Sequence, residues 1–117
     1  ELGSDVATLA GNATDPAHAP AAIALAGERF GGFHALYHVA GGSGRRIGDG
    51  PLHELTDEGI RGTLELNLHY VMLSNRAAVR CFLARGHGGS ILNLVVTGQV
   101  LAVDGGWSVT EGQIPKN

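Results

Sequence analysis

The sequence is poor in several features that mark broad classes of protein. It has one cysteine, Cys81, so no internal disulfide can form, and a reducing cytoplasm is the expected location. No apolar run approaches the roughly 18 residues of a membrane span, and no signal-peptide pattern is present. The formal charge is -3, and the largest basic cluster is the pair Arg45 and Arg46. We therefore expect neither a membrane nor a nucleic acid as a partner.

Residues spaced for metal binding are also lacking, although the sequence has six histidines. His34 and His38 lie four residues apart, which on a strand separates them by about 13 Å, too far for one ion. No Asp, Glu or Cys stands at a ligand spacing that would make a metal site of His53, His69 or His87. We therefore predict no metal site.

Glycine, in contrast, is abundant. The sequence has 19 glycines in 117 residues, which exceeds the average use of about 7%. They separate segments that have regular apolar patterns, which predicts many tight connections. The length predicts one domain at most, with a single hydrophobic core.

The longest patterned segment, residues 56–86, predicts an α-helix. Its apolar side chains recur at steps of three and four on one helical face: Ile60, Leu64, Leu68, Val71, Val79, Phe82 and Leu83. Thr56 is the predicted N-cap and Gly86 the predicted end. Gly59 and Gly62 each weaken the first turns by roughly 1 kcal/mol relative to alanine, so packing must supply the difference. Cys81 is expected to be a small core or interface residue.

The other patterned segments alternate between strands and helices. Apolar runs predict strands at residues 6–10, 35–39, 90–95 and 99–103. A helix is expected from Pro20, since an earlier start would place this proline inside it, to Phe30. Residues 41–50 are expected to form a surface loop. Strand, helix, strand, helix, strand is the pattern of an α/β fold with a parallel sheet.

Four segments carry a further pattern: ERFGGFHALYHVAGG, LHELTDEGIRGTLELNLHYVMLSNRAAV, GGSILNL and VTGQVLAVDGGWSV. In this order they resemble the short-chain dehydrogenase/reductase family. The first is similar to the family's strand and loop ending in Asn-Asn-Ala-Gly, where this sequence has His38, Val39, Ala40 and Gly41. The second resembles its long interface helix, with Asn67 at the position of the catalytic asparagine. The third is similar to the strand before the catalytic serine, and the fourth to the C-terminal strand and loop.

This resemblance implies a fold. It implies an incomplete Rossmann-like doubly wound parallel sheet with three α/β/α layers, and a single partial NAD(P)-binding domain over residues 1–117. In the family's strand order, 3-2-1-4-5-6-7, the predicted strands would be the third, fourth, fifth and seventh. Only the strands at 35–39 and 90–95 would then be direct neighbours.

The resemblance also implies an oxidoreductase that transfers hydride between NAD or NADP and a small carbonyl or alcohol substrate. The family asparagine at the position of Asn67 bends the helix and holds a water of the proton relay. An asparagine on a helix can also simply bond a neighbouring backbone. Asn12 and Ala13 stand where the family contacts the adenine, with a turn as the alternative role for Asn12. Ala40 and Gly41 would let the ribose and nicotinamide approach, or would be ordinary turn formers.

Two parts of the family pattern have no counterpart in these residues. One is the first strand with its Gly-rich phosphate turn. The loop at 41–50 cannot replace this turn, because it has neither the G-x-G-x-x-G spacing of the glycines nor the lysine of a P-loop. The other is the serine and the helix with Tyr-x-x-x-Lys, where Val95 and Val96 stand instead. We expect missing segments before Glu1 and near residues 94–97, through joined parts of a longer protein or through a real truncation or deletion.

The catalytic set is correspondingly incomplete. Neither Tyr37 nor Tyr70 is followed four residues later by a lysine, and the only lysine is Lys116. Of the family's Asn, Ser, Tyr and Lys only Asn67 remains, so the 117 residues alone are expected to be inactive.

The competing hypothesis is a non-catalytic oligomerisation or regulatory module. Association as a homodimer or homotetramer is expected through the helix at 56–86 and the C-terminal DGGWS segment, in which Trp107 would pack at a subunit contact. Nucleotide binding would separate the two hypotheses, because catalysis requires it and association does not.

Overall fold

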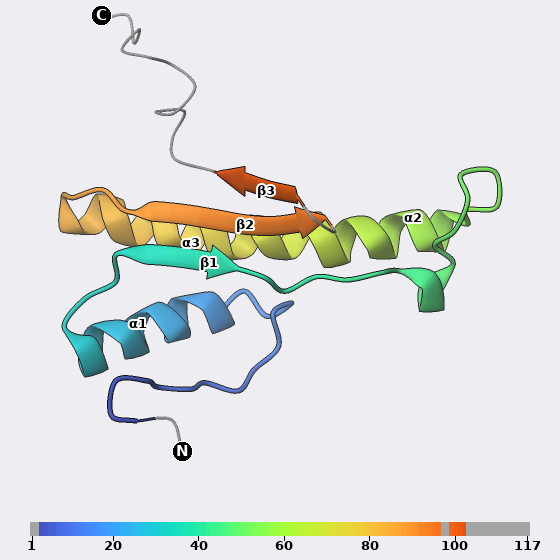
Figure 1. The fold of residues 1–117 in the computed structure, drawn as a ribbon. Coiled ribbons are helices and arrows are strands. Elements are labelled where there is room, and N and C mark those ends of the chain that lie inside the picture. Colours follow the sequence, from blue (N-terminus) through green and yellow to red (C-terminus); the bar gives the residue numbers. More distant parts are fainter. Residues whose placement is uncertain (1–2, 97–98, 103–117) are drawn as a thin grey trace, which may run out of the picture.

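The structure is a computed structural model that describes residues 3–96 and 99–102 (Figure 1). In chain order its elements are α1 (His18–Phe30), β1 (Ala35–His38), the 3-10 turn η1 (Arg45–Ile47), α2 (Asp57–Leu64), the π turn η2 (Glu65–His69), α3 (Tyr70–Arg85), β2 (Ser90–Val96) and β3 (Gln99–Ala102). The DGGWS segment with Trp107 lies outside the described residues. None of the described helices combines the length and the hydrophobicity that crossing a bilayer requires.

The sheet has three strands in the order β1-β2-β3. β1 and β2 are parallel, with Ala35 paired to Ser90 and His38 to Asn93, which confirms the predicted pairing of these two strands. β3 is antiparallel to β2, so the predicted parallel arrangement is wrong for this strand. Two residues separate β2 from β3. So short a connection can join antiparallel neighbours, whereas parallel neighbours need a crossover of about a dozen residues.

The hydrophobic core lies between α3 and one face of the sheet. Ala78 and Phe82 of α3 are buried together with Ile91 of β2, and Phe33 and Leu36 pack against them. The rings of Phe33 and Phe82 stack with their centroids 5.3 Å apart. Every second strand residue points to the same face, so Leu36 and Ile91 meet the helix together.

The opposite face of the sheet is open in the part of the chain that the structure describes. Tyr37 on β1 is 62% exposed, and among the described helices only α3 and the adjoining π turn contact β1 and β2. α1 packs against α3 instead, beside β1 (Figure 1). The α/β class and the partial Rossmann-like arrangement are as predicted, but these residues supply two layers where we expected three.

α1 begins at His18, two residues before the predicted start. Pro20 is accommodated because it lies in the first turn, where amide groups have no partner within a helix. The first helical hydrogen bond runs from the amide of Ala21 to the carbonyl of Ala17, at 3.1 Å. The helix ends before Gly31, as predicted.

The predicted strand at residues 6–10 is wrong. These residues have no strand conformation, and the apolar side chains of Val6 and Leu9 are exposed. An apolar run becomes a strand only where a neighbouring strand can satisfy its backbone hydrogen bonds, and in the described sheet β1 pairs only with β2.

The long helix predicted at residues 56–86 is present as α2, the π turn and α3, which follow one another along a single rod in Figure 1. Thr56 caps its start, with Oγ1 accepting a hydrogen bond from the amide of Gly59 at 2.9 Å. The helix ends at Gly86, whose backbone has the left-handed conformation. A Cβ at Gly59 would overlap the carbonyl group of Gly48 in the loop beside the helix. The glycine that weakens the helix therefore allows this loop to pack against it.

Replacing Phe82 with alanine should lower the free energy of unfolding by about 3 to 5 kcal/mol, because the substitution leaves a cavity in the core. Urea titration followed by circular dichroism measures the change. The control is Leu52→Ala, since the side chain of Leu52 is 86% exposed, and its loss should cost less than about 0.5 kcal/mol. Equal losses in the two variants would contradict this location of the core.

Candidate functional site

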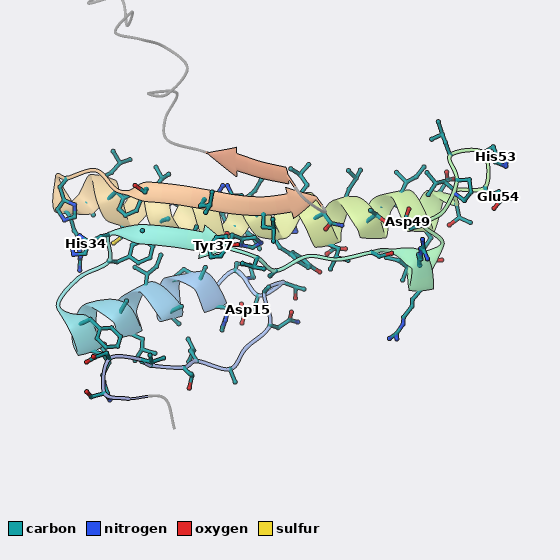
Figure 2. The ribbon with its side chains drawn as sticks, in the orientation of Figure 1. Asp15, His34, Tyr37, Asp49, His53 and Glu54 are labelled. Atoms are coloured by element: carbon teal, nitrogen blue, oxygen red, sulfur yellow. The ribbon has the colours of Figure 1, made fainter. Side chains whose placement is uncertain are left out.

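The loop that follows β1 meets the π turn of the long helix at the carboxyl ends of the two parallel strands. In α/β sheets this is the edge at which ligands bind. Figure 2 shows Tyr37 on β1 and the chain that runs on from this strand along the helix. Side chains of β1, η2, α3 and β2 converge on this region and form its polar groups.

Asn67, in the middle of the π turn, binds the backbone of this loop. Its Oδ1 accepts a hydrogen bond from the amide of Gly42 at 3.0 Å, and its Nδ2 donates to the carbonyl of Gly42 at 2.8 Å. Nδ2 also donates to the carbonyl of Thr63, one turn earlier, at 3.0 Å. A Cβ on Gly41 would lie 2.9 Å from Asn67 Oδ1, so a larger residue would push the two apart. The structure thus joins two predicted site residues, Asn67 and Gly41.

His38 holds the same loop from the strand side. It is 7% exposed, and its Nε2 lies 2.8 Å from the carbonyl oxygen of Ala40. A carbonyl can only accept, so Nε2 carries a proton, and Nδ1 lies 2.7 Å from Ser74 Oγ. The Ser74 hydroxyl lies 3.0 Å from the carbonyl of Val71 as well. His38 therefore ties Ala40 to α3 although it replaces the asparagine of the family pattern.

The sequence analysis did not identify Ser74 or Asn93. Ser74 lies on the buried face of α3 together with Val71 and Ala78. Its hydroxyl, at helical spacing among apolar residues, was the feature of the sequence that could have identified it. Asn93 is 0% exposed, and neither Oδ1 nor Nδ2 has a hydrogen-bond partner among the described residues. An unsatisfied buried group costs about 1 to 3 kcal/mol. Because Asn93 pairs in register with His38, the last residue of β1, a donor and an acceptor without partners lie buried in the middle of β2, beside the end of β1.

Two of the predicted cofactor residues share a cavity. Ala13 and Ala40 both line a hollow of about 360 Å³ between α1, β1 and α3. Asn12 does not line it. Its Oδ1 accepts from the amide of Thr14 at 3.0 Å, which is the turn role that we considered for it. Contact of Asn12 with an adenine stays a prediction.

The loop after β1 has small residues where it leaves the strand, since residues 40–42 are Ala, Gly and Gly. Such residues let a ligand approach the backbone closely. The loop at 41–50 folds around η1, with the amide of Gly44 bound to Asp49 Oδ2 at 3.2 Å. Among residues 3–96 and 99–102 no α-helix begins directly after a strand, as it does where a pyrophosphate binds, because residues 39–56 separate β1 from α2. Nor do three His, Cys, Asp or Glu side chains in these ranges lie close enough to hold a metal ion.

One family model matches residues 1–96, and it is described as enoyl-(acyl carrier protein) reductase. This match covers all the elements from α1 to β2, including the loop and the π turn that form the site. A comparison with curated proteins gives no match.

Three solved structures are similar to this chain. A short-chain dehydrogenase from Mycobacterium smegmatis is 32% identical, with a TM-score of 0.61, over 73% of this chain and 33% of its own. One from Burkholderia cenocepacia in complex with NADP is 29% identical, with a TM-score of 0.52, over 73% and 32%. An NADH-dependent reductase of alginate metabolism complexed with NAD is 21% identical, with a TM-score of 0.54, over 73% and 36%, and shows the fold alone. The chain spans about a third of the length of these structures.

Replacing Asn67 with alanine should make the amide hydrogen of Gly42 exchange about fivefold faster with solvent, because its acceptor is lost and one hydrogen bond contributes roughly 1 kcal/mol. Hydrogen exchange followed by NMR measures this rate. Asn75→Ala is the matched control, since Asn75 lies on the same helix and makes no hydrogen bond to the loop. Similar exchange rates in both variants would show that Asn67 does not hold the loop.

Proposed function

Since this chain belongs to the short-chain dehydrogenase/reductase family, we propose that it forms part of the active site of an enzyme that transfers hydride between NAD or NADP and a small carbonyl or alcohol substrate. Members of this family are NAD(P)-dependent oxidoreductases. Because the chain spans about a third of the similar structures, the proposed activity is that of a complete active site to which these residues contribute.

The observation that carries this proposal is the pair of hydrogen bonds between Asn67 and Gly42. Both amide hydrogens of Asn67 are donated, to Gly42 and to Thr63, while Oδ1 accepts one bond and keeps a second lone pair. Asn67 would hold the loop where the ribose and the nicotinamide approach. Its remaining lone pair would hold the water of a proton relay.

The cofactor, when bound, supplies or accepts the hydride. Ala40 and Gly41 would leave room for its ribose, while Asn12 and Ala13 would lie on the adenine side. Both NAD and NADP are proposed, since one similar structure is complexed with NADP and another with NAD. With Cys81 as the single cysteine, a reducing cytoplasm remains the proposed location.

The acid/base group must come from outside these residues. Tyr37 and Tyr70 lack a lysine four residues later, and Val95 and Val96 stand where the family has serines. A tyrosine whose pKa is lowered by a neighbouring lysine, supplied by another segment, would move the proton to or from the substrate oxygen. The 117 residues alone should therefore show no oxidoreductase activity.

A chimera tests this proposal directly. Residues 35–94 would replace the matching segment of the Mycobacterium smegmatis dehydrogenase, which supplies the remaining parts of a complete active site. The chimera should oxidise or reduce the cofactor, followed by NAD(P)H absorbance. Asn67→Ala should lower its kcat at least about 100-fold, since a proton relay contributes about 10² to 10⁴ in rate.

The control in this chimera is Asn75→Ala, which should keep kcat within about threefold because Asn75 makes no bond to the loop. Circular dichroism shows whether each variant is folded. A folded chimera without activity, or one that keeps its kcat after Asn67→Ala, would mean that these residues do not serve the proposed reaction.

Association is a second candidate function, favoured by an exposed apolar stripe along the long helix. Its side chains are 42% to 76% exposed and follow one another mostly at steps of four: Ile60, Leu64, Leu68, Met72, Val79 and Leu83. Exposed apolar side chains that recur along one helix are typical of an interaction site, although Asn75 and Arg76 stand between Met72 and Val79. We propose that a second copy covers this stripe, in a homodimer or homotetramer that also uses the DGGWS segment. Association through this stripe would be compatible both with an enzyme and with a non-catalytic module.

The double substitution Leu64→Glu and Leu68→Glu should convert the oligomer into a monomer, because it places buried like charges in the interface. Sedimentation velocity measures the mass. In the monomer these side chains are 54% and 50% exposed, so the fold should tolerate the change. Leu52→Glu, which introduces one glutamate at an exposed leucine outside the stripe, should leave the oligomer intact. A monomeric parent chain would contradict the proposed interface.

A further inference from the structure

A second cavity lies between α1 and α3, on the side of the long helix that faces α1. The two helices pack side by side (Figure 1). The residues that face each other are short, notably Ala24 and Gly27 on α1 and Ala77 on α3, so they leave a hollow of about 610 Å³. This volume is within the range of about 300 to 1,000 Å³ that is typical of small-molecule sites. Ile23 and Leu73 add apolar surface to its walls.

Arginines line the same cavity. Arg76 and Arg80 lie one turn apart on α3, and Arg85 follows at the end of the helix. None of the three forms an ion pair or a side-chain hydrogen bond among the described residues, although Glu28 also lines the cavity. This local positive charge contrasts with the formal charge of -3 of the whole chain.

Arg85 has a structural role that the other two lack. Its guanidinium lies beside Gly27 and Gly32, at the C-terminal end of α1. A cation is favourable there, because the last carbonyl groups of a helix form its negative pole. Arg76 and Arg80 are exposed, and within residues 3–96 and 99–102 neither forms an ion pair or a side-chain hydrogen bond, so both are available to an anion.

We propose that this cavity binds a single-chain carboxylate amphiphile, such as a medium-chain fatty acid. Its carboxylate lies between Arg76 and Arg80, whose planar guanidinium groups match the two carboxylate oxygens. Its hydrocarbon chain lies along Ile23, Leu73 and Ala77. The site is separate from the loop at Gly42 and does not depend on the proposed oxidoreductase function.

The choice of ligand follows from the arginines and the apolar walls of the cavity taken together. An inorganic anion would pair with the arginines but would leave the apolar walls in contact with water. A neutral alcohol would cover the walls but would leave both guanidinium groups without a partner. Only a ligand with one anionic end and one apolar chain satisfies the charge and the surface together.

Isothermal titration of the 117-residue chain with dodecanoate, below its micelle-forming concentration, tests the proposal. The double variant Arg76→Gln and Arg80→Gln should weaken binding at least about tenfold, because two charge-assisted hydrogen bonds are lost. The control, Arg45→Gln and Arg46→Gln, removes the same charge from η1, outside the cavity. It should change the affinity less than about twofold.

Further variants and probes distinguish the alternatives. Ala24→Phe fills the cavity while keeping both arginines, and it should also weaken binding at least about tenfold. Dodecanol and inorganic phosphate should each bind at least about tenfold more weakly than dodecanoate. No binding of dodecanoate, an equal loss in the control variant, or phosphate binding as tight as dodecanoate would overturn the proposal. Thermal unfolding of each variant confirms that it is folded.

Discussion

The packing of the helix at residues 57–85 against β1 and β2 is the constraint on which the rest of the structure depends. Ala78 and Phe82 meet Ile91 of the sheet, and this contact sets the rotation of the whole helix about its axis. Side chains leave a helix at about 100° per residue, so every other face then has a fixed direction. One face turns to α1, another carries the exposed apolar stripe, and the π turn lies at the ends of the strands.

The polar groups at the strand ends bind the loop to this packed scaffold. Asn67 holds Gly42 from the π turn, and His38 holds Ala40 while its Nδ1 lies 2.7 Å from Ser74 Oγ of α3. The loop is thus attached to the helix at two points, by side chains that the core keeps in place. Neither polar atom of the Asn93 side chain has a partner among the described residues, and buried Thr63 Oγ1 and Asn75 Oδ1 lack one as well. A buried amide without a hydrogen-bond partner needs a physical explanation, whereas one whose hydrogen bonds are satisfied does not.

The packing of the family fold is present in the described residues. The parallel pair and the long helix are those of the family that residues 1–96 match, and Asn67 lies in the π turn of that helix. The tyrosine and lysine that move the proton are not in the sequence at the required spacing. A fold can keep its packing without its acid/base groups, because packing depends on apolar volume and catalysis on a few polar atoms.

The sequence by itself determined the elements with strong periodic patterns: the helix at 57–85 with its cap at Thr56, the pairing of β1 with β2, and the position of Asn67 within that helix. The helix, its cap and the position of Asn67 follow from local spacing, whereas the pairing of β1 with β2 was implied by the resemblance to the family. The tertiary structure alone decided that residues 6–10 form no strand, that β3 is antiparallel, and that Ser74 meets His38 across 36 positions of the chain. Such features depend on which distant groups are available as partners, and local spacing contains no information about them.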